Sequence, residues 1–499
     1  AASYNGITSK TFGTSSIMIG DTTTGTIDAA NFNIGLGVDV YNALTTGDSN
    51  IAIGHQALYS NTTGGTNVGI GHGSLYNNTT ASNNTAVGYF SLLANTTGTQ
   101  NTAVGANALD ANTTNVRNTG VGYNALTAAT NDDNTAVGAQ ALEANTTGYY
   151  NVAMGYQAGA AITTGNSNVA IGTLALDANT TASNNTAVGH AALTANTTGH
   201  SCVAVGSTAL DANTTGVGNN AVGRDALGAN TSGSANQAFG RDVLSANTTG
   251  ASNSAFGDSA LKANTTASNN TAVGQSALLA NTTGAGNTVV GRIAGDAITT
   301  ANSNCCFGNS AGGALTTGHS NITIGESSAN ATVALTTGAA NTVIGHEART
   351  AAAGTNTSNV IGYQVTGVGN DNTTFGIGTN DSNIAAGATT ITAPSDGRLK
   401  EDIQDEEIGL DFINDLRPVT FRWKKEKDCP SHMRVYKENS EERVMNGKYN
   451  HGFIAQEVKK VIDNHNLKDG FDMWTEDELD GRQRVGEAAL MPLMVKAVQ

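Results

Sequence analysis

A glycine recurs with a 17-residue period along most of this chain. From Gly20 to Gly325 it closes the recurring phrase N-T-A-V-G, and the spacing is constant except between Gly122 and Gly138, where it is shorter by a single residue. The full repeat reads N-T-A-V-G-x-x-A-L-x-A-N-T-T-G-x-x. A fixed period of this length indicates a fold in which one short unit is stacked many times.

The chemistry of each repeat position indicates β-structure. Asn, Thr and Gly recur too often for a helix, because their helix propensities are poor. The residue before the glycine is always apolar, as at Val104, and we expect its side chain to point inward from a strand. The x-A-L-x-A stretch supplies a second inward side chain, such as Leu109, and N-T-T-G has the residues of a turn. Each repeat is predicted to form strand, turn, strand and turn, which is one coil of a β-solenoid.

The repeat phrases resemble the head repeats of trimeric autotransporter adhesins, a left-handed parallel β-roll in which N-x-A-[IV]-G also recurs. The period is longer here, and N-T-T-G fills the extra turn. Stacking of identical coils would place Asn over Asn and Thr over Thr in hydrogen-bonded ladders. Since Ala and Val bury little surface, we expect three chains to associate and cover each other's apolar stripe. The predicted fold class is mainly β: a trimeric parallel β-roll or β-solenoid with a 17-residue repeat.

The residue after the repeat glycine varies, as in His55, His72, Arg224 and Glu326, and we expect it to face outward. Two interpretations stay open for this column, a face that contacts a ligand and a merely solvated face. His55 and His72 could bind a metal only with a further ligand. None is evident in the sequence, so neither a metal nor a cofactor is predicted.

Charge and cysteine content exclude several other classes of protein. The net charge of -16 argues against nucleic-acid binding, because that function requires a basic surface. No apolar run reaches the length of a membrane span, so membrane insertion is not expected. The four cysteines show no C-x-x-C spacing, which argues against a disulfide framework and against a zinc site.

The chain changes character near Pro394. Residues 1–394 contain 7 Lys and Arg and 18 Asp and Glu, whereas residues 395–499 contain 17 and 22. All four prolines lie from Pro394 onward, and both tryptophans lie beyond it. We predict a repeat shaft over 1–376, a linker over 377–394, and a small, helix-rich α+β domain over 395–499.

Four motifs follow one another in this last region. They are A-P-S-D-G-R-L-K-E-D-I from Ala393, G-L-D-F-I-N-D-L-R-P-V-T-F-R-W-K from Gly409, H-G-F-I-A-Q-E-V from His451, and A-A-L-M-P-L-M-V-K-A-V from Ala488. In order and spacing they resemble the intramolecular chaperone domain that ends phage tailspikes, endosialidases and tail fibres, a family of self-cleaving serine peptidases. The resemblance covers about residues 393–499.

This resemblance implies a domain that trimerises, drives folding of the β-structured fibre before it, and then cuts itself off. It places the required serine at Ser395, with Lys400 five residues further on. Together these would form a nucleophile and an amine base. The bond that the resemblance implies for cleavage lies between Pro394 and Ser395.

The resemblance also implicates a histidine in the H-x-G-x-I-A-Q region, which corresponds here to His451. Asp396 and Arg398 belong to the same motif as Ser395 and are predicted as auxiliary residues. An alternative interpretation needs no catalysis, because the phrase P-S-D-G is well suited to a β-turn.

Three functions compete on these observations. The first is a viral tail fibre or spike in the virion, which is extracellular after assembly and attaches to a host receptor or glycan. It would form a homotrimer, contact other tail proteins and process itself. The second is a bacterial trimeric surface adhesin, or another extracellular fibre without proteolysis. The third is a glycan depolymerase, which would need paired carboxylates in the shaft, and the sequence shows no candidate pair.

Overall fold

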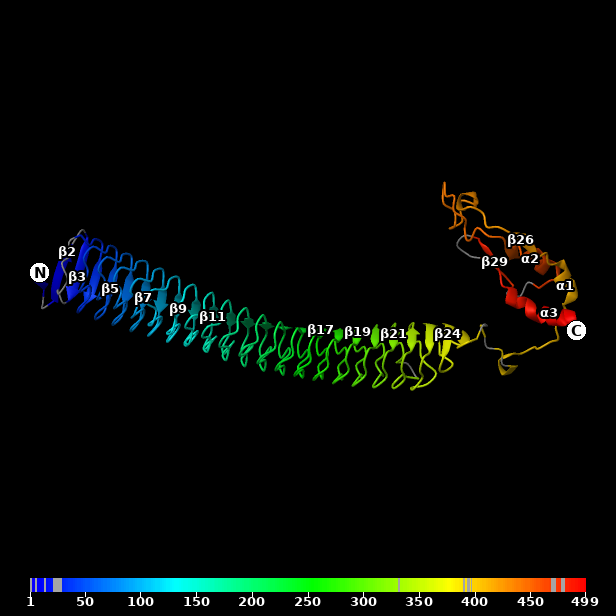
Figure 1. Ribbon diagram of the computed structural model, residues 1–499, viewed down its shortest axis with the longest axis horizontal. Coiled ribbons are helices and arrows are strands. Elements are labelled where there is room, and N and C mark those ends of the chain that lie inside the picture. The colour runs from blue at the N-terminus through cyan, green and yellow to red at the C-terminus, as the bar shows by residue number, and fades with distance from the viewer. Residues whose placement is uncertain are drawn as a thin grey trace. The chain divides into compact units, whose positions relative to one another are not determined.

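In a computed structural model, the chain divides into two compact units, Ala1–Pro394 and Ser395–Gln499 (Figure 1). The structure describes residues 2–4, 7–12, 15–20, 29–330, 333–388, 391–392, 395, 397–467, 473–476 and 481–499. Within these ranges, no helix combines the length and the apolar character that a bilayer crossing requires. The first unit is a stack of coils, and the described helices all belong to the second.

The first unit is built on 22 parallel strands, β3 to β24, which follow one another along the stack in chain order (Figure 1). Each strand pairs with the one a coil further on in the repeat register, so that Ala204 faces Ala221. The predicted β-solenoid with its 17-residue period is confirmed. Its strands are β3 (Ser16–Gly20), β4 (Ile34–Gly37), β5 (Ile51–Ile53), β6 (Val68–Ile70), β7 (Thr85–Val87), β8 (Thr102–Val104), β9 (Thr119–Val121), β10 (Thr135–Val137), β11 (Val152–Met154), β12 (Val169–Ile171), β13 (Thr186–Val188), β14 (Val203–Val205), β15 (Asn220–Val222), β16 (Gln237–Phe239), β17 (Ser254–Phe256), β18 (Thr271–Val273), β19 (Thr288–Val290), β20 (Cys305–Phe307), β21 (Ile322–Ile324), β22 (Thr342–Ile344), β23 (Asn359–Tyr363) and β24 (Asn372–Ile377).

Antiparallel strands close both ends of the stack. At the N-terminal end, β1 (Ala2–Tyr4) and β2 (Ile7–Phe12) pair with each other, and β2 continues onto β3. At the other end, β25 (Asn380–Ala385) pairs with β24. Strand β25 lies inside the segment that we had assigned to a linker, 377–394. These pairings occupy the open backbone edges that would otherwise invite further strands.

The prediction that the residue before the glycine points inward is wrong. In β8 the buried residue is Ala103, while Val104 is 37% exposed, and in β20 Phe307 is 57% exposed. Successive side chains of a strand point to opposite faces. Because the small Ala occupies the inward position, the narrow interior is filled, and the bulkier side chain beside the glycine lies on the outer face.

The second predicted strand of each repeat is also absent from the described coils. The stretch that contains Leu109 is a run of turns, and Leu109 itself has a φ of 54°, in the left-handed region. Its side chain is nevertheless fully buried, as predicted. The amide of Leu109 donates to the carbonyl oxygen of Ala125 in the next coil at 3.0 Å, so turn backbone as well as strand backbone is bonded between coils.

Two ladders of buried asparagine run along the stack, as predicted. In the first, the backbone amide of Asn67 donates to Oδ1 of Asn50 at 2.9 Å, and Nδ2 of Asn67 donates to the carbonyl of Ala81 at 2.8 Å. In the second, Nδ2 of Asn78 donates to Oδ1 of Asn61 at 2.9 Å. Most of their polar groups therefore find partners inside a core that is otherwise rich in Ala and Leu.

The second unit packs three helices and two short antiparallel ladders. Its elements are η1 (Gly397–Leu399), α1 (Leu410–Asp415), β26 (Val419–Phe421), η2 (Glu426–Asp428), β27 (Asn450–Gly452), α2 (Ala455–Asn464), β28 (Trp474–Glu476), β29 (Gln483–Val485), η3 (Glu487–Ala489) and α3 (Leu490–Val498). Strand β26 pairs with β27, and β28 pairs with β29. The core comes from α1, α2, α3 and the segments beside them: Phe412, Leu416, Val458, Ile462, Met473, Leu490 and Leu493.

Candidate functional site

Ser395 and Lys400 lie side by side at the start of the second unit. Nζ of Lys400 donates a hydrogen bond to Oγ of Ser395 at 2.8 Å, and both residues are exposed. The single turn η1 connects them, and the amide of Lys400 donates to the carbonyl of Gly397 at 3.3 Å within it. This turn brings the chain back far enough for the long lysine side chain to reach the serine five residues earlier.

The contact places an amine next to a hydroxyl, which are the two groups that a Ser-Lys nucleophile requires. In the geometry described, the lysine nitrogen is the donor. For catalysis the same contact must run the other way, with the serine hydroxyl donating to a neutral amine. The separation of 2.8 Å is short enough for that proton transfer.

Of the other predicted site residues, the structure describes Arg398 and His451. Asp396 and Pro394 lie outside the described residues. Arg398 lies in η1 and is exposed. His451 lies in β27 opposite Thr420 of β26 and lines a shallow hollow formed by residues 418–420 and 451–453. Among the described residues, no hydrogen bond or ion pair connects His451 with Ser395 or Lys400, so its catalytic role stays a prediction.

Ion pairs on the surface of the second unit connect segments that carry the sequence motifs. Nε of Arg417, just before β26, donates to Oε2 of Glu457 in α2 at 2.9 Å. The hydrogen bond from Arg417 lowers the pKa of Glu457. Nε2 of His465 lies 2.8 Å from Oδ2 of Asp415 at the end of α1. These contacts fix α1, β26 and α2 relative to one another.

The column after the repeat glycine faces outward in the shaft, as expected. The rings of His55 and His72 stack with centroids 4.9 Å apart, and His72 stacks in turn on Tyr89 at 5.4 Å. Nε2 of His55 lies 4.0 Å from Oδ2 of Asp39. Over the described part of the chain, no group of three or more His, Cys, Asp and Glu side chains lies together as a metal would need.

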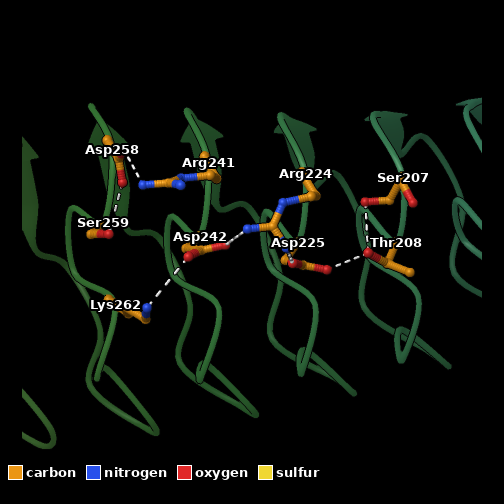
Figure 2. Close-up of polar contacts among 9 residues, drawn as sticks. All are labelled: Ser207, Thr208, Arg224, Asp225, Arg241, Asp242, Asp258, Ser259 and Lys262. Carbon is orange, nitrogen blue, oxygen red and sulfur yellow. Dashed lines mark hydrogen bonds and ion pairs between the residues drawn. The ribbon is translucent and has the colours of Figure 1, made fainter.

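A network of charges crosses several coils of the same face, and sequence analysis had not predicted it (Figure 2). Nη2 of Arg224 donates to Oδ1 of Asp242 at 3.1 Å, and Nη2 of Arg241 donates to Oδ2 of Asp258 at 2.7 Å. Lys262 also contacts Asp242, at 3.4 Å. Hydrogen bonds from Ser259 and Arg241 lower the pKa of Asp258.

The network contains three basic and three acidic side chains, because Asp225 also pairs with Arg224. Its charges balance, so we interpret it as a cross-coil connection and not as an ion-binding site. The sequence carried a signal for it: the adjacent pair Arg-Asp occurs at the same repeat positions in two consecutive coils.

Together, the fold and the site define a structural fibre made of stacked coils, which is followed by a small domain with an exposed Ser-Lys contact. Residues 395–467 match the family model described as chaperone of endosialidase. This match and the 17-residue β-solenoid fit a tail fibre of the endosialidase type, as the sequence resemblance implied. Neither the curated proteins nor the solved structures compared with the chain contain a match.

Proposed function

We propose that this chain is a viral tail-fibre or spike protein whose C-terminal unit trimerises, assists folding of the shaft and then cuts the chain before Ser395. The observation that carries the proposal is the 2.8 Å contact between Ser395 and Lys400, because it lies at the start of the segment that matches the chaperone family. The shaft supplies the fibre, and the domain after it supplies the folding and processing function.

The proposed cleavage is a single event in each chain. Oγ of Ser395 attacks the carbonyl carbon of the preceding residue, Pro394, while the neutral amine of Lys400 accepts the hydroxyl proton. The peptide bond between them breaks, the lysine returns the proton to the departing amine, and an ester to Ser395 remains. One water molecule hydrolyses this ester. The products are a carboxylate at Pro394 and a free amine at Ser395.

A lysine side chain loses its proton more easily in a desolvated site than in water, because removal from water disfavours the charged form. In the single chain both side chains are exposed. We therefore propose that cleavage follows trimerisation, because other copies of the domain could cover the pair. This order would keep the chaperone attached until the shaft has assembled.

Host attachment is proposed for the outward column of the shaft. The inward positions repeat Ala, Leu and Asn, while the column after the glycine changes from coil to coil. Variation on a rigid scaffold is typical of surfaces that contact partners. The proposed partners are a host cell-surface receptor or glycan and other tail proteins, and the proposed location is the virion.

The test compares three purified chains on a denaturing gel: the unchanged chain, Ser395→Ala and the control Ser431→Ala, which changes an exposed serine of the same unit. We expect the unchanged chain and the control to give two fragments that meet at residue 394–395. Ser395→Ala should give one full-length band. If all three chains stay full-length in the assembled state, self-cleavage is wrong, and the alternative of a surface fibre without proteolysis is favoured.

A further inference from the structure

One outward-facing column of the shaft is apolar along its whole length. In each of the 22 strands β3 to β24, the residue before the glycine is Val, Ile, Leu, Met or Phe, and it points away from the core. Met154 is 47% exposed and Phe307 is 57% exposed. The rings of Phe239 and Phe256 stack with centroids 5.0 Å apart, so the large side chains form a continuous column. Apolar surface of this extent on a soluble protein marks a contact with something else.

The same face carries no charge. The face has a second column two residues earlier in each strand, as at Thr102, Val203 and Gln237. Most of its members are Thr, Ser, Asn or Gln and the others are apolar or Cys, so none of them is Asp, Glu, Lys or Arg. Charged side chains of the shaft lie in other columns, as Arg224 does after its glycine and Asp110 does after its leucine. A protein with a net charge of -16 therefore keeps one face free of ionisable acids and bases.

The dimensions suit a specific protein contact. With about 4.8 Å between neighbouring strands, 22 strands extend over roughly 100 Å, and a face of two outward residues is about 7–10 Å wide. Its area is on the order of 700–1000 Å², close to the ~800 Å² that each partner buries in an ordinary specific interface.

We infer that this face, defined by the residues one and three positions before each repeat glycine of β3 to β24, is where parallel copies of the same chain pack against one another. This inference rests on the proposed association of several copies and names the surface that it uses. A second copy has the same spacing between its strands, so it can match the face coil by coil along its full length. An unrelated partner would have no reason to repeat with the same period.

Symmetry gives this face a specific place in the assembly. In a closed ring of parallel chains, each copy presents the same stripe toward the common axis. Side chains of equal height then meet across that axis. One acidic substitution on the stripe would place several like charges together in a region without water, which is strongly unfavourable.

The test uses the full-length Ser395→Ala chain, which stays uncut, with Cys305→Ser and Cys429→Ser, which remove the two cysteines that are not fully buried. Val104→Cys is added on the face, or Thr114→Cys is added at an exposed turn of the same coil. Light scattering first gives the number of copies, and a short bismaleimide then cross-links cysteines that lie close together. We expect Val104→Cys, and not Thr114→Cys, to give a band at twice the chain mass on a denaturing gel.

The outcomes separate this inference from the proposed function. If the assembly contains several copies but Val104→Cys does not cross-link, the face is wrong and the association stands. If light scattering finds a single chain, both are wrong. As a second measurement, Val104→Asp should lower the melting temperature of the assembled shaft while Thr114→Asp leaves it unchanged. Circular dichroism should show β-structure in both variants, because Val104 points outward from its own coil.

Discussion

The two units of this chain achieve a folded state in opposite ways. The shaft stacks similar coils on 22 parallel strands, and its inward positions are mostly Ala, Leu and Asn. Backbone hydrogen bonds join each coil to the next. The second unit has one small core, centred on Phe412, and each of its elements is different. A repeat fold distributes its stability over neighbouring units, whereas a small globular unit depends on one cluster. Because its coils are alike, the shaft is also poorly protected against pairing one coil out of register.

The largest expected difference between the units concerns glycine. Gly206 has a φ of 140°, and a Cβ placed on it would lie 2.4 Å from the carbonyl oxygen of Gly223 in the next coil. Gly206→Ala should destabilise the shaft by more than about 4 kcal/mol, because both the backbone conformation and the contact forbid a side chain. Urea unfolding followed by circular dichroism measures the change.

Gly447 in the second unit is the matched control, because no atom lies within 4 Å of a Cβ placed there. Gly447→Ala should change the free energy of unfolding by no more than about 0.5 kcal/mol. A similar loss from both substitutions would show that coil-to-coil approach does not explain the shaft glycines.

The second prediction concerns a coil in which two inward positions are exchanged. Gly159 stands where most coils have Leu, and Ile162 stands where most have Asn. Two later coils carry the same kind of change, at Gly295 and Gly312. A Cβ on Gly159 would lie 2.9 Å from Cδ1 of Ile162, so the isoleucine fills the missing volume. Ile162 interrupts the second asparagine ladder, because it cannot donate to Oδ1 of Asn145 in the preceding coil, and that buried oxygen has no partner among the described residues.

We therefore expect Gly159→Leu and Ile162→Asn each to destabilise the shaft, the first by overpacking and the second by leaving a cavity. The double variant restores the common repeat. It should recover about 1–3 kcal/mol relative to the sum of the single changes in a double-mutant cycle of urea midpoints. Additive losses would contradict the proposed compensation.

A smaller effect, and a gain in stability, is expected when Cys202 is changed to Asn. Cys202 occupies a position of the first ladder that is Asn in most other coils. Its backbone amide keeps the ladder geometry and donates to Oδ1 of Asn185 at 2.9 Å, and its thiol donates to the carbonyl of Gly216 at 3.4 Å. A thiol cannot offer the amide oxygen that continues the ladder to Asn219. Cys202→Asn should raise the free energy of unfolding by about 0.5–1.5 kcal/mol. A lower melting temperature than that of the unchanged chain would contradict this.

The smallest effect is a difference in how the units respond to acid. Burial raises the pKa of Asp110, Asp177, Asp211 and Asp296 in the shaft, so protonation of these groups favours the folded state as the pH falls toward their unfolded values. In the second unit, hydrogen bonds from Lys425 and Lys427 lower the pKa of Glu441 to about 2. Its stabilisation is present above the unfolded pKa and is lost as the pH falls from about 4.5 toward 2.

Scanning calorimetry at several pH values between about 7 and 3 measures both transitions. We expect the melting temperature of the second unit to fall first, by a small amount, because exposed ion pairs contribute little. Two shaft aspartates, Asp133 and Asp258, have lowered pKa values and partly offset the gain in the shaft. A shaft transition that falls earlier than that of the second unit would contradict the difference.

Much of the fold could be predicted from the sequence, because a fixed period places the same residue types at the same point of every coil. The period, the buried Leu109 and the asparagine ladders all follow from residues that recur at fixed positions. The direction of Val104 could not be predicted from its apolar character alone. That choice depends on which of the two alternating sides of the short strand meets the coil interior, and this side carries Ala103 and not Val104. The left-handed φ of Leu109 was equally hidden, since leucine rarely adopts it.

Of the candidate site, only the local contact could be predicted from the sequence. The contact between Ser395 and Lys400 joins residues within one motif, and a local turn explains it. The position of His451 depends on how β27 pairs with β26, which no local pattern specifies. The charge network around Arg241 depends on which coils are adjacent, and it becomes visible only once the 17-residue stack is known.

We expect the shaft to need the C-terminal unit in order to fold in register. The most direct measurement compares residues 1–394 produced alone with the full-length Ser395→Ala chain, which keeps the unit attached. We expect the full-length chain to give a soluble assembly with one sharp shaft transition, and residues 1–394 alone to give aggregates or a broad transition. If residues 1–394 alone reach the same copy number and the same melting temperature, the shaft folds without its chaperone and the account is wrong.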